Sequence, residues 1–129
     1  MRNKEILYSL GKFKEALNRL NEAVQLKDSP LLVDAVIQRF EFSFELAWKT
    51  LKRVLIDEGV IVQTPREVLK EAFKLGYLED EELWLDMLSD RNSMIHTYNE
   101  MQALEVYKNV PRYYESLLSL YKKIDEDFK

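Results

Sequence analysis

The residues of this chain whose types could do chemistry lie together between Asp90 and Tyr98. This stretch holds the single histidine of the sequence, His96, with Arg91 five residues before it and Tyr98 two residues after it. Arginine binds and neutralises phosphate, histidine transfers protons near neutral pH, and a tyrosine hydroxyl can be hydrogen-bonded or modified. If the protein is an enzyme, its chemistry is expected in this stretch.

The composition excludes several classes of protein. The 129 residues suffice for one domain, expected to cover 1–129 with a frayed end at 124–129, and the hydrophobic fraction of 47% is enough for a core. Without cysteine and with one histidine, neither disulfides nor a cysteine- or histidine-rich metal centre is expected. The sequence contains neither a long apolar run nor a signal peptide, which predicts a cytoplasmic protein without a membrane span. A net charge of -4 argues against a surface that binds nucleic acid by charge alone, so a phosphate site has to be local.

The spacing of the apolar residues predicts an all-α protein. Stripes at intervals of three and four residues indicate helices over about 3–26 and 30–58, with Ser29 as the cap of the second. Thr64 and Glu67 form a capping-box pattern before a short helix that ends at Gly76, and Asp80 caps a fourth helix. The last helix covers about 99–128, and Pro111 is expected to kink or divide it.

The second predicted helix is apolar on more than one side. Phe40 and Phe44 continue its main stripe, whereas Phe42 and Leu46 lie on the opposite side. Two interpretations remain open here. The helix either packs inside its own bundle and also against a partner chain, or it is simply the central helix of the bundle.

Helix geometry limits how Arg91 and His96 can act together. Residues five apart on an ideal helix are separated by about 140° around the axis and ~7.5 Å along it. The two side chains can converge on one point if the helix ends nearby, if long side chains reach round it, or if a second copy of the chain contributes.

A purely structural interpretation of the stretch is also open. Arg91 falls in an apolar row, where an arginine is often ion-paired, and a lone histidine is often a packing residue. Candidate partners for Arg91 come from an acidic run that precedes it, consisting of Glu79, Asp80, Glu81, Glu82, Asp86 and Asp90. That run fits a solvated helix start better than a docking site for a basic partner.

Two segments resemble a known family. The sequence from Arg91 to His96, with Asn92 as the polar residue, is similar to the arginine–histidine signature of HEPN domains. Continued to Tyr98, it matches the R-x4-H-x-Y form of the toxin halves of HEPN/MNT toxin–antitoxin pairs. Residues 42–52 resemble the second helix of the subgroup labelled nucleotidyltransferase substrate-binding proteins. The resemblance covers about residues 17–124.

The resemblance implies a fold and an activity. The fold would be an antiparallel up-and-down bundle of four long helices and a short one, which forms a homodimer. The activity would be that of an endoribonuclease that needs no metal or cofactor. His96 would be the general acid and base, Arg91 would stabilise phosphate charge, and Asn92 would support one of them, because RNA supplies its own 2′-hydroxyl nucleophile.

The resemblance also implies a partner. In such pairs an MNT-type nucleotidyltransferase, the antitoxin, would adenylylate Tyr98 and place a tethered phosphate beside Arg91. Two alternatives stand beside this hypothesis. The chain could be a non-catalytic substrate-binding subunit of a two-component nucleotidyltransferase, or a helical interaction module in which Arg91 pairs with Asp86 or Asp90.

Overall fold

The computed structural model describes residues 2–26, 30–96 and 99–128, and these residues form five α-helices and no strand. The helices are α1 (Arg2–Gln25), α2 (Pro30–Asp57), α3 (Pro65–Lys74), α4 (Glu81–His96) and α5 (Glu100–Phe128). Four are long and α3 is short, so the predicted all-α fold is confirmed.

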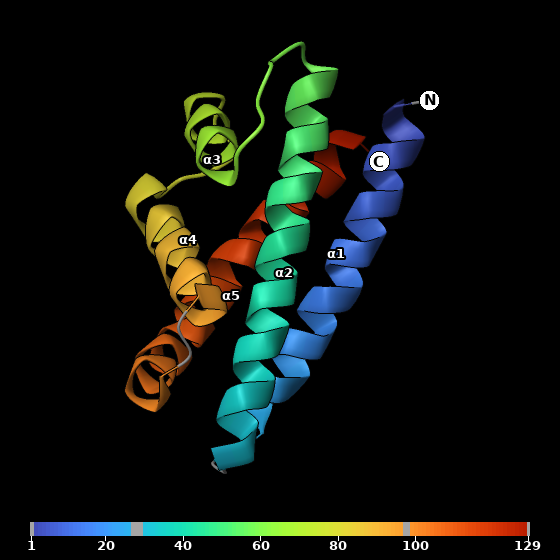
Figure 1. Cartoon of the computed structure of the whole chain (residues 1–129). Helices are drawn as coiled ribbons and strands as arrows, with labels where there is room; N and C mark the ends of the chain where they lie inside the picture. The colour runs from blue at the N-terminus through green and yellow to red at the C-terminus, as the bar shows by residue number, and fades with distance from the viewer. Residues whose placement is uncertain (1, 27–29, 97–98, 129) are drawn as a thin grey trace.

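Helix α2 is the central element of the bundle. It runs antiparallel to α1, while α5 crosses behind both and α3 and α4 lie on the other side of α2 (Figure 1). α2 contacts all four other helices, and α1 contacts only α2 and α5. The interpretation of α2 as a central helix therefore holds, and its exposed Phe42, at 57%, leaves a contact with another chain open.

The apolar stripes form the core as their spacing predicts. Phe13 from α1 and Phe40 and Phe44 from α2 have no exposed side-chain area. The ring of Phe40 stacks on that of Tyr113 from α5 with 5.3 Å between centroids. Aromatic pairs of this kind add to the free energy gained by burying their area.

The predicted turn residues set the helix ends. Thr64 and Glu67 form the complete capping box at the start of α3, and Asp80 Oδ1 accepts a hydrogen bond from Leu83 N at 3.0 Å at the start of α4. Gly59 and Gly76 have φ angles of +87° and +85°, which other residues adopt only with strain.

Three further expectations concern residues at the ends and in the middle of helices. Helix α5 is continuous across Pro111, so the expected division of the helix is wrong, whereas the kink stays a prediction. Pro111 removes one backbone hydrogen bond, which the packing of α5 tolerates. Residues up to Phe128 are helical, and Ile124 is fully buried; fraying is a matter of motion and stays a prediction. Ser29 lies outside the described residues.

Small side chains line the contact between α1 and α2. Ser9 Oγ and Thr50 Oγ1 are both buried and lie 2.5 Å apart in a hydrogen bond. Seven residues further along α1 and seven back along α2, the same antiparallel register places Ala16 opposite Ser43. Ser43 is fully buried, and among the described residues its hydroxyl has no hydrogen-bond partner.

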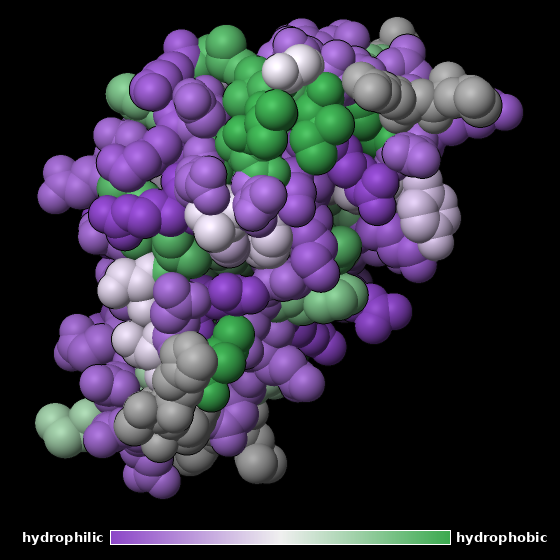
Figure 2. All heavy atoms as spheres, turned by 45° about the horizontal axis from the view of Figure 1, so that its top comes forward, coloured by the Kyte–Doolittle hydropathy of each residue, from purple (hydrophilic) through white to green (hydrophobic). Residues whose placement is uncertain are grey.

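Large apolar side chains are exposed at the end of the bundle where α2 ends. Figure 2 looks onto this end, where hydrophobic side chains gather. Ile56 is 41% exposed and Ile61, in the link to α3, is 89% exposed. This surface lies at the opposite end of α2 from its start near Pro30.

Candidate functional site

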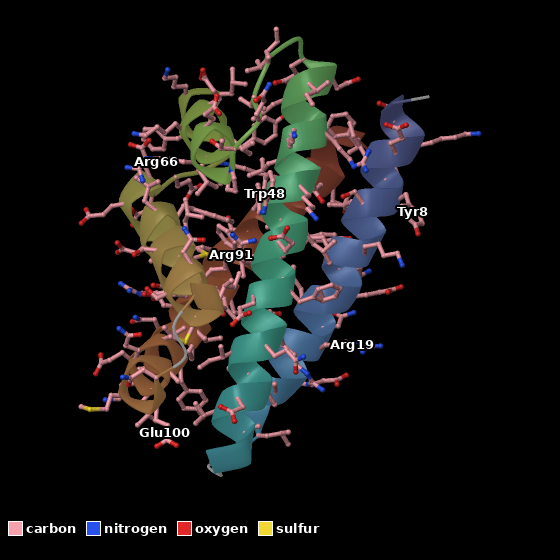
Figure 3. All side chains as sticks on the ribbon, viewed as in Figure 1. Tyr8, Arg19, Trp48, Arg66, Arg91 and Glu100 are labelled. Carbon is pink, nitrogen blue, oxygen red and sulfur yellow. The ribbon has the colours of Figure 1, made fainter. Side chains whose placement is uncertain are left out.

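The centre of the candidate site is the guanidinium of Arg91, which lies between α4 and α2 (Figure 3). Its Nη2 donates a hydrogen bond to Glu45 Oε2 from α2, and its Nη1 donates to Asn92 Oδ1 at 3.1 Å. The side chain of Arg91 is 17% exposed, so the charge is largely inside the protein but still reached by solvent. Of the site residues that the resemblance implies, Arg91 and Asn92 are therefore hydrogen-bonded to each other.

Glu45 is shared among three donors. Besides Arg91, its Oε2 accepts from Trp48 Nε1 at 3.1 Å, and its Oε1 lies 3.1 Å from Lys49 Nζ. Burial raises the pKa of Glu45, but the hydrogen bonds from Trp48 and Lys49 and the charge of Arg91 outweigh burial and lower it. The carboxylate is therefore ionised at neutral pH.

A second carboxyl group, Glu41, lies one helical turn before Glu45 on α2. Burial raises its pKa, and the charge of Arg91 only partly opposes that effect. One guanidinium thus faces two carboxyl groups whose environments shift their pKa values in opposite directions.

Asp90 does not pair with Arg91, and neither does Asp86. Asp90 Oδ2 accepts a hydrogen bond of 2.6 Å from the hydroxyl of Tyr113, which is 1% exposed. Burial raises the pKa of the Tyr113 hydroxyl, and this hydrogen bond and the charges of Asp90 and Asp86 raise it further. The alternative in which Arg91 pairs with Asp86 or Asp90 is therefore wrong about the partner. Arg91 is ion-paired, but with Glu45 from another helix.

The remaining predicted site residues are only partly described. His96 is the last residue of α4, while its side chain and all of Tyr98 lie outside the described residues. α4 is helical from Arg91 to His96, so the two side chains leave the backbone in directions about 140° apart around the helix axis. Since the helix does not end between them, long side chains that reach round it or a second copy of the chain remain as the ways for them to converge.

Sequence reasoning missed Glu45. The available signal was a pair of carboxyl groups four residues apart, Glu41 and Glu45, with apolar neighbours along α2. Carboxylates in such surroundings need a cationic partner, and Arg91 is likewise charged within an apolar row. A search for opposite charges embedded in apolar rows of different helices would have paired them.

The described residues contain no cluster of three or more histidine, cysteine, aspartate or glutamate side chains that could hold a metal ion. None of the helices, over the residues that the structure describes, is long and apolar enough to cross a membrane.

Comparison with known proteins shows the family. Residues 8–126 match the family described as nucleotidyltransferase substrate binding protein like. The chain belongs to this family. A relative from Haemophilus influenzae, named "Probable ribonuclease HepT", is 31% identical over 84 residues, which cover 61% of this chain and 58% of the relative.

Two solved structures have the same fold. A crystal structure of a protein from Thermus thermophilus superposes with a TM-score of 0.81 at 36% identity and covers 87% of this chain and 98% of its own. A Haemophilus influenzae structure, described as revealing the fold of a substrate binding domain of a nucleotidyltransferase, has a TM-score of 0.68 at 21% identity, covering 95% and 98%. The family predicted from residues 42–52 and 91–98 is confirmed.

Proposed function

We propose that this protein is a metal-independent endoribonuclease of the toxin type, in which Arg91 and His96 carry out cleavage and Asn92 supports Arg91. The observation that carries the proposal is the Arg91 guanidinium, held at the inner side of α4 five residues before the end of the helix at His96. The name of the Haemophilus influenzae relative, a probable ribonuclease, supports the same activity.

The chemistry requires two groups. His96 takes the proton from the ribose 2′-hydroxyl or gives one to the leaving 5′ oxygen, and Arg91 neutralises the charge that develops on the phosphate. The 2′-hydroxyl is the nucleophile, so neither a metal nor a cofactor is needed. Asn92 accepts a hydrogen bond from Arg91 and so restricts the rotation of the guanidinium.

The proposed active unit is a homodimer. Two side chains that start about 140° apart on one helix reach a common phosphate more easily when a second copy contributes one of them. Large apolar side chains are exposed near the end of α4 and the start of α5, as expected for a surface that another chain covers: Ile95 at 52%, Met101 at 78% and Leu104 at 47%.

The proposed control acts on Tyr98. A partner MNT-type nucleotidyltransferase would attach AMP to its hydroxyl, seven residues after Arg91, and the tethered phosphate would occupy the arginine. The family description, which names nucleotidyltransferases, supports this class of partner.

Expression of the chain alone tests the ribonuclease. We expect wild type and Ser89→Ala, a control on an exposed position of α4, to slow growth and degrade RNA, and His96→Ala and Arg91→Ala to do neither. Growth and intact RNA in all four cultures would contradict the nuclease. Partner control is tested by adding the nucleotidyltransferase, which should restore growth with wild type but not with Tyr98→Phe.

A second candidate function is favoured by the family description itself: a non-catalytic substrate-binding subunit of a two-component nucleotidyltransferase. This alternative predicts stable association with the nucleotidyltransferase and no RNA cleavage by either protein. Cleavage that depends on His96 would exclude it.

A further inference from the structure

The ion pair between Arg91 and Glu45 has a consequence for any anion that binds at this site. Arg91 is the group proposed to bind the RNA phosphate, yet one of its terminal nitrogens already donates to a carboxylate oxygen. A carboxylate and a phosphate make the same kind of hydrogen bonds with a guanidinium. Glu45 therefore holds part of the surface that a phosphate would use.

The Arg91 guanidinium has donors left over. A guanidinium carries five N–H groups, and among the described residues Arg91 uses one for Glu45 and one for Asn92. A phosphate can approach the remaining N–H groups, but only beside the carboxylate. Two anions on one guanidinium repel each other, and this repulsion is strongest where solvent is partly excluded.

The carboxylate of Glu45 is itself firmly held. Trp48 and Lys49, both on α2 like Glu45, donate to its two oxygens. The side chain of Glu45 is 28% exposed, and moving it away from Arg91 would also disturb its contacts with Trp48 and Lys49. Competition for Arg91 is therefore built into the folded chain.

We propose that Glu45 is an internal competitor for the Arg91 guanidinium. An RNA phosphate that binds Arg91 has to compete with the Glu45 carboxylate. The inference rests on the proposed function in that it takes RNA as the ligand. The carboxylate weakens the binding of RNA, because part of the favourable free energy of binding is offset by the repulsion between the phosphate and Glu45.

The test compares RNA binding by charge variants in a His96→Ala background, where cleavage does not interfere. Glu45→Gln removes the negative charge but keeps a side-chain oxygen for Trp48 and Arg91. The matched control is Glu15→Gln, an equal charge change at an exposed position of α1, a helix that makes no contact with α4. The probe is a short fluorescein-labelled single-stranded RNA, and Kd is measured over a range of salt concentrations.

We expect Glu45→Gln to bind the RNA about tenfold more tightly than Glu15→Gln does, which corresponds to about 1.4 kcal/mol. The slope of log K against log salt should become steeper by about 0.7, because one more phosphate is neutralised. Both changes should vanish when Arg91→Ala is added. Urea unfolding of each variant checks that it is folded, and a loss of stability alone would not change the salt slope.

Two results would overturn the inference: equal binding by Glu45→Gln and Glu15→Gln, or a gain that persists without Arg91. If the Glu45→Gln gain appears but the protein with His96 cleaves no RNA, the ribonuclease fails and the competition stands. If RNA is cleaved but the gain is absent, the competition fails alone. If no variant binds RNA, both are refuted.

Discussion

Replacement of Tyr113 by phenylalanine tests how α4 is fixed to α5 beside the site. The Tyr113 hydroxyl donates to Asp90 Oδ2 at 2.6 Å, and Asp90 is the residue directly before Arg91. The substitution keeps the ring, which stacks on Phe40, and removes only the hydroxyl. Any loss of stability therefore reports the hydrogen bond and not a cavity.

The expected size of the Tyr113→Phe effect follows from this hydrogen bond. Hydrogen bonds to charged groups contribute about 1.5–3 kcal/mol, and since Asp90 is only half-buried and can be partly solvated, we expect about 1–2 kcal/mol. For 129 residues, an unfolding entropy of about 2.1 cal/mol/K per residue converts this into a Tm decrease of about 4–7 °C.

The Tyr113→Phe effect should depend on pH. The pKa of the Tyr113 hydroxyl is raised above its ordinary value of 10.0, so the folded state holds this proton more tightly than the unfolded state does. The stability that the hydroxyl contributes is fully present below pH 10 and is lost as the pH rises above it. The difference between wild type and Tyr113→Phe should therefore shrink above pH 10.

Urea unfolding at pH 7 and at a series of alkaline pH values measures both effects. Tyr121→Phe is the control, since its hydroxyl makes no hydrogen bond within the described part of the chain, and it should cost less than about 0.5 kcal/mol. A loss below 0.5 kcal/mol for Tyr113→Phe, or a loss that does not change with alkaline pH, would refute the reasoning.

Three further substitutions concern polar side chains of α1 and α2 that are buried or half-buried. Ser43→Ala removes a buried hydroxyl that has no partner among the described residues, so the free energy of unfolding of this variant should be unchanged or up to about 1 kcal/mol higher. Ser9→Ala leaves the Thr50 hydroxyl unpaired and should lower the free energy of unfolding by about 1–2 kcal/mol in the same urea experiment. Glu41→Gln should stabilise the protein at pH 7 by less than about 1 kcal/mol, because burial disfavours the ionised form. Since the pKa of Glu41 is raised in the folded state, this gain should disappear below its ordinary value of 4.5; a gain that persists at pH 4 would contradict the cause.

The predictable parts of the fold were those decided by local physics. The capping box of Thr64 and Glu67 and the cap at Asp80 involve residues three apart, and their hydrogen bonds need nothing beyond one helical turn. The stripes that bury Phe13 and Phe44 follow from helical periodicity in the same way. A division at Pro111 was wrongly expected because the local cost of this proline is opposed by packing along all of α5.

The candidate site was predictable only in part. The motif identified Arg91 and Asn92. These residues are adjacent on α4, so a hydrogen bond between their side chains could be expected from the sequence. Glu45 could not be reached in this way, since it is 46 residues away and meets Arg91 through the packing of α4 on α2. Asp90 looked like a partner from its position, but the direction of its side chain takes it to Tyr113.

The hydrogen bond between Trp48 and Glu45 gives the protein an optical reporter of its own. The chain has two tryptophans, and Trp84 is buried in the core at 2% exposure, whereas the indole N–H of Trp48 donates to the carboxylate that also binds Arg91. Indole fluorescence depends on the charge and polarity around the ring, so we expect the emission of Trp48 to change with the state of that ion pair, and Trp48→Phe would show how much of the signal comes from Trp84. Occupation of the guanidinium can thus be read without attaching a label.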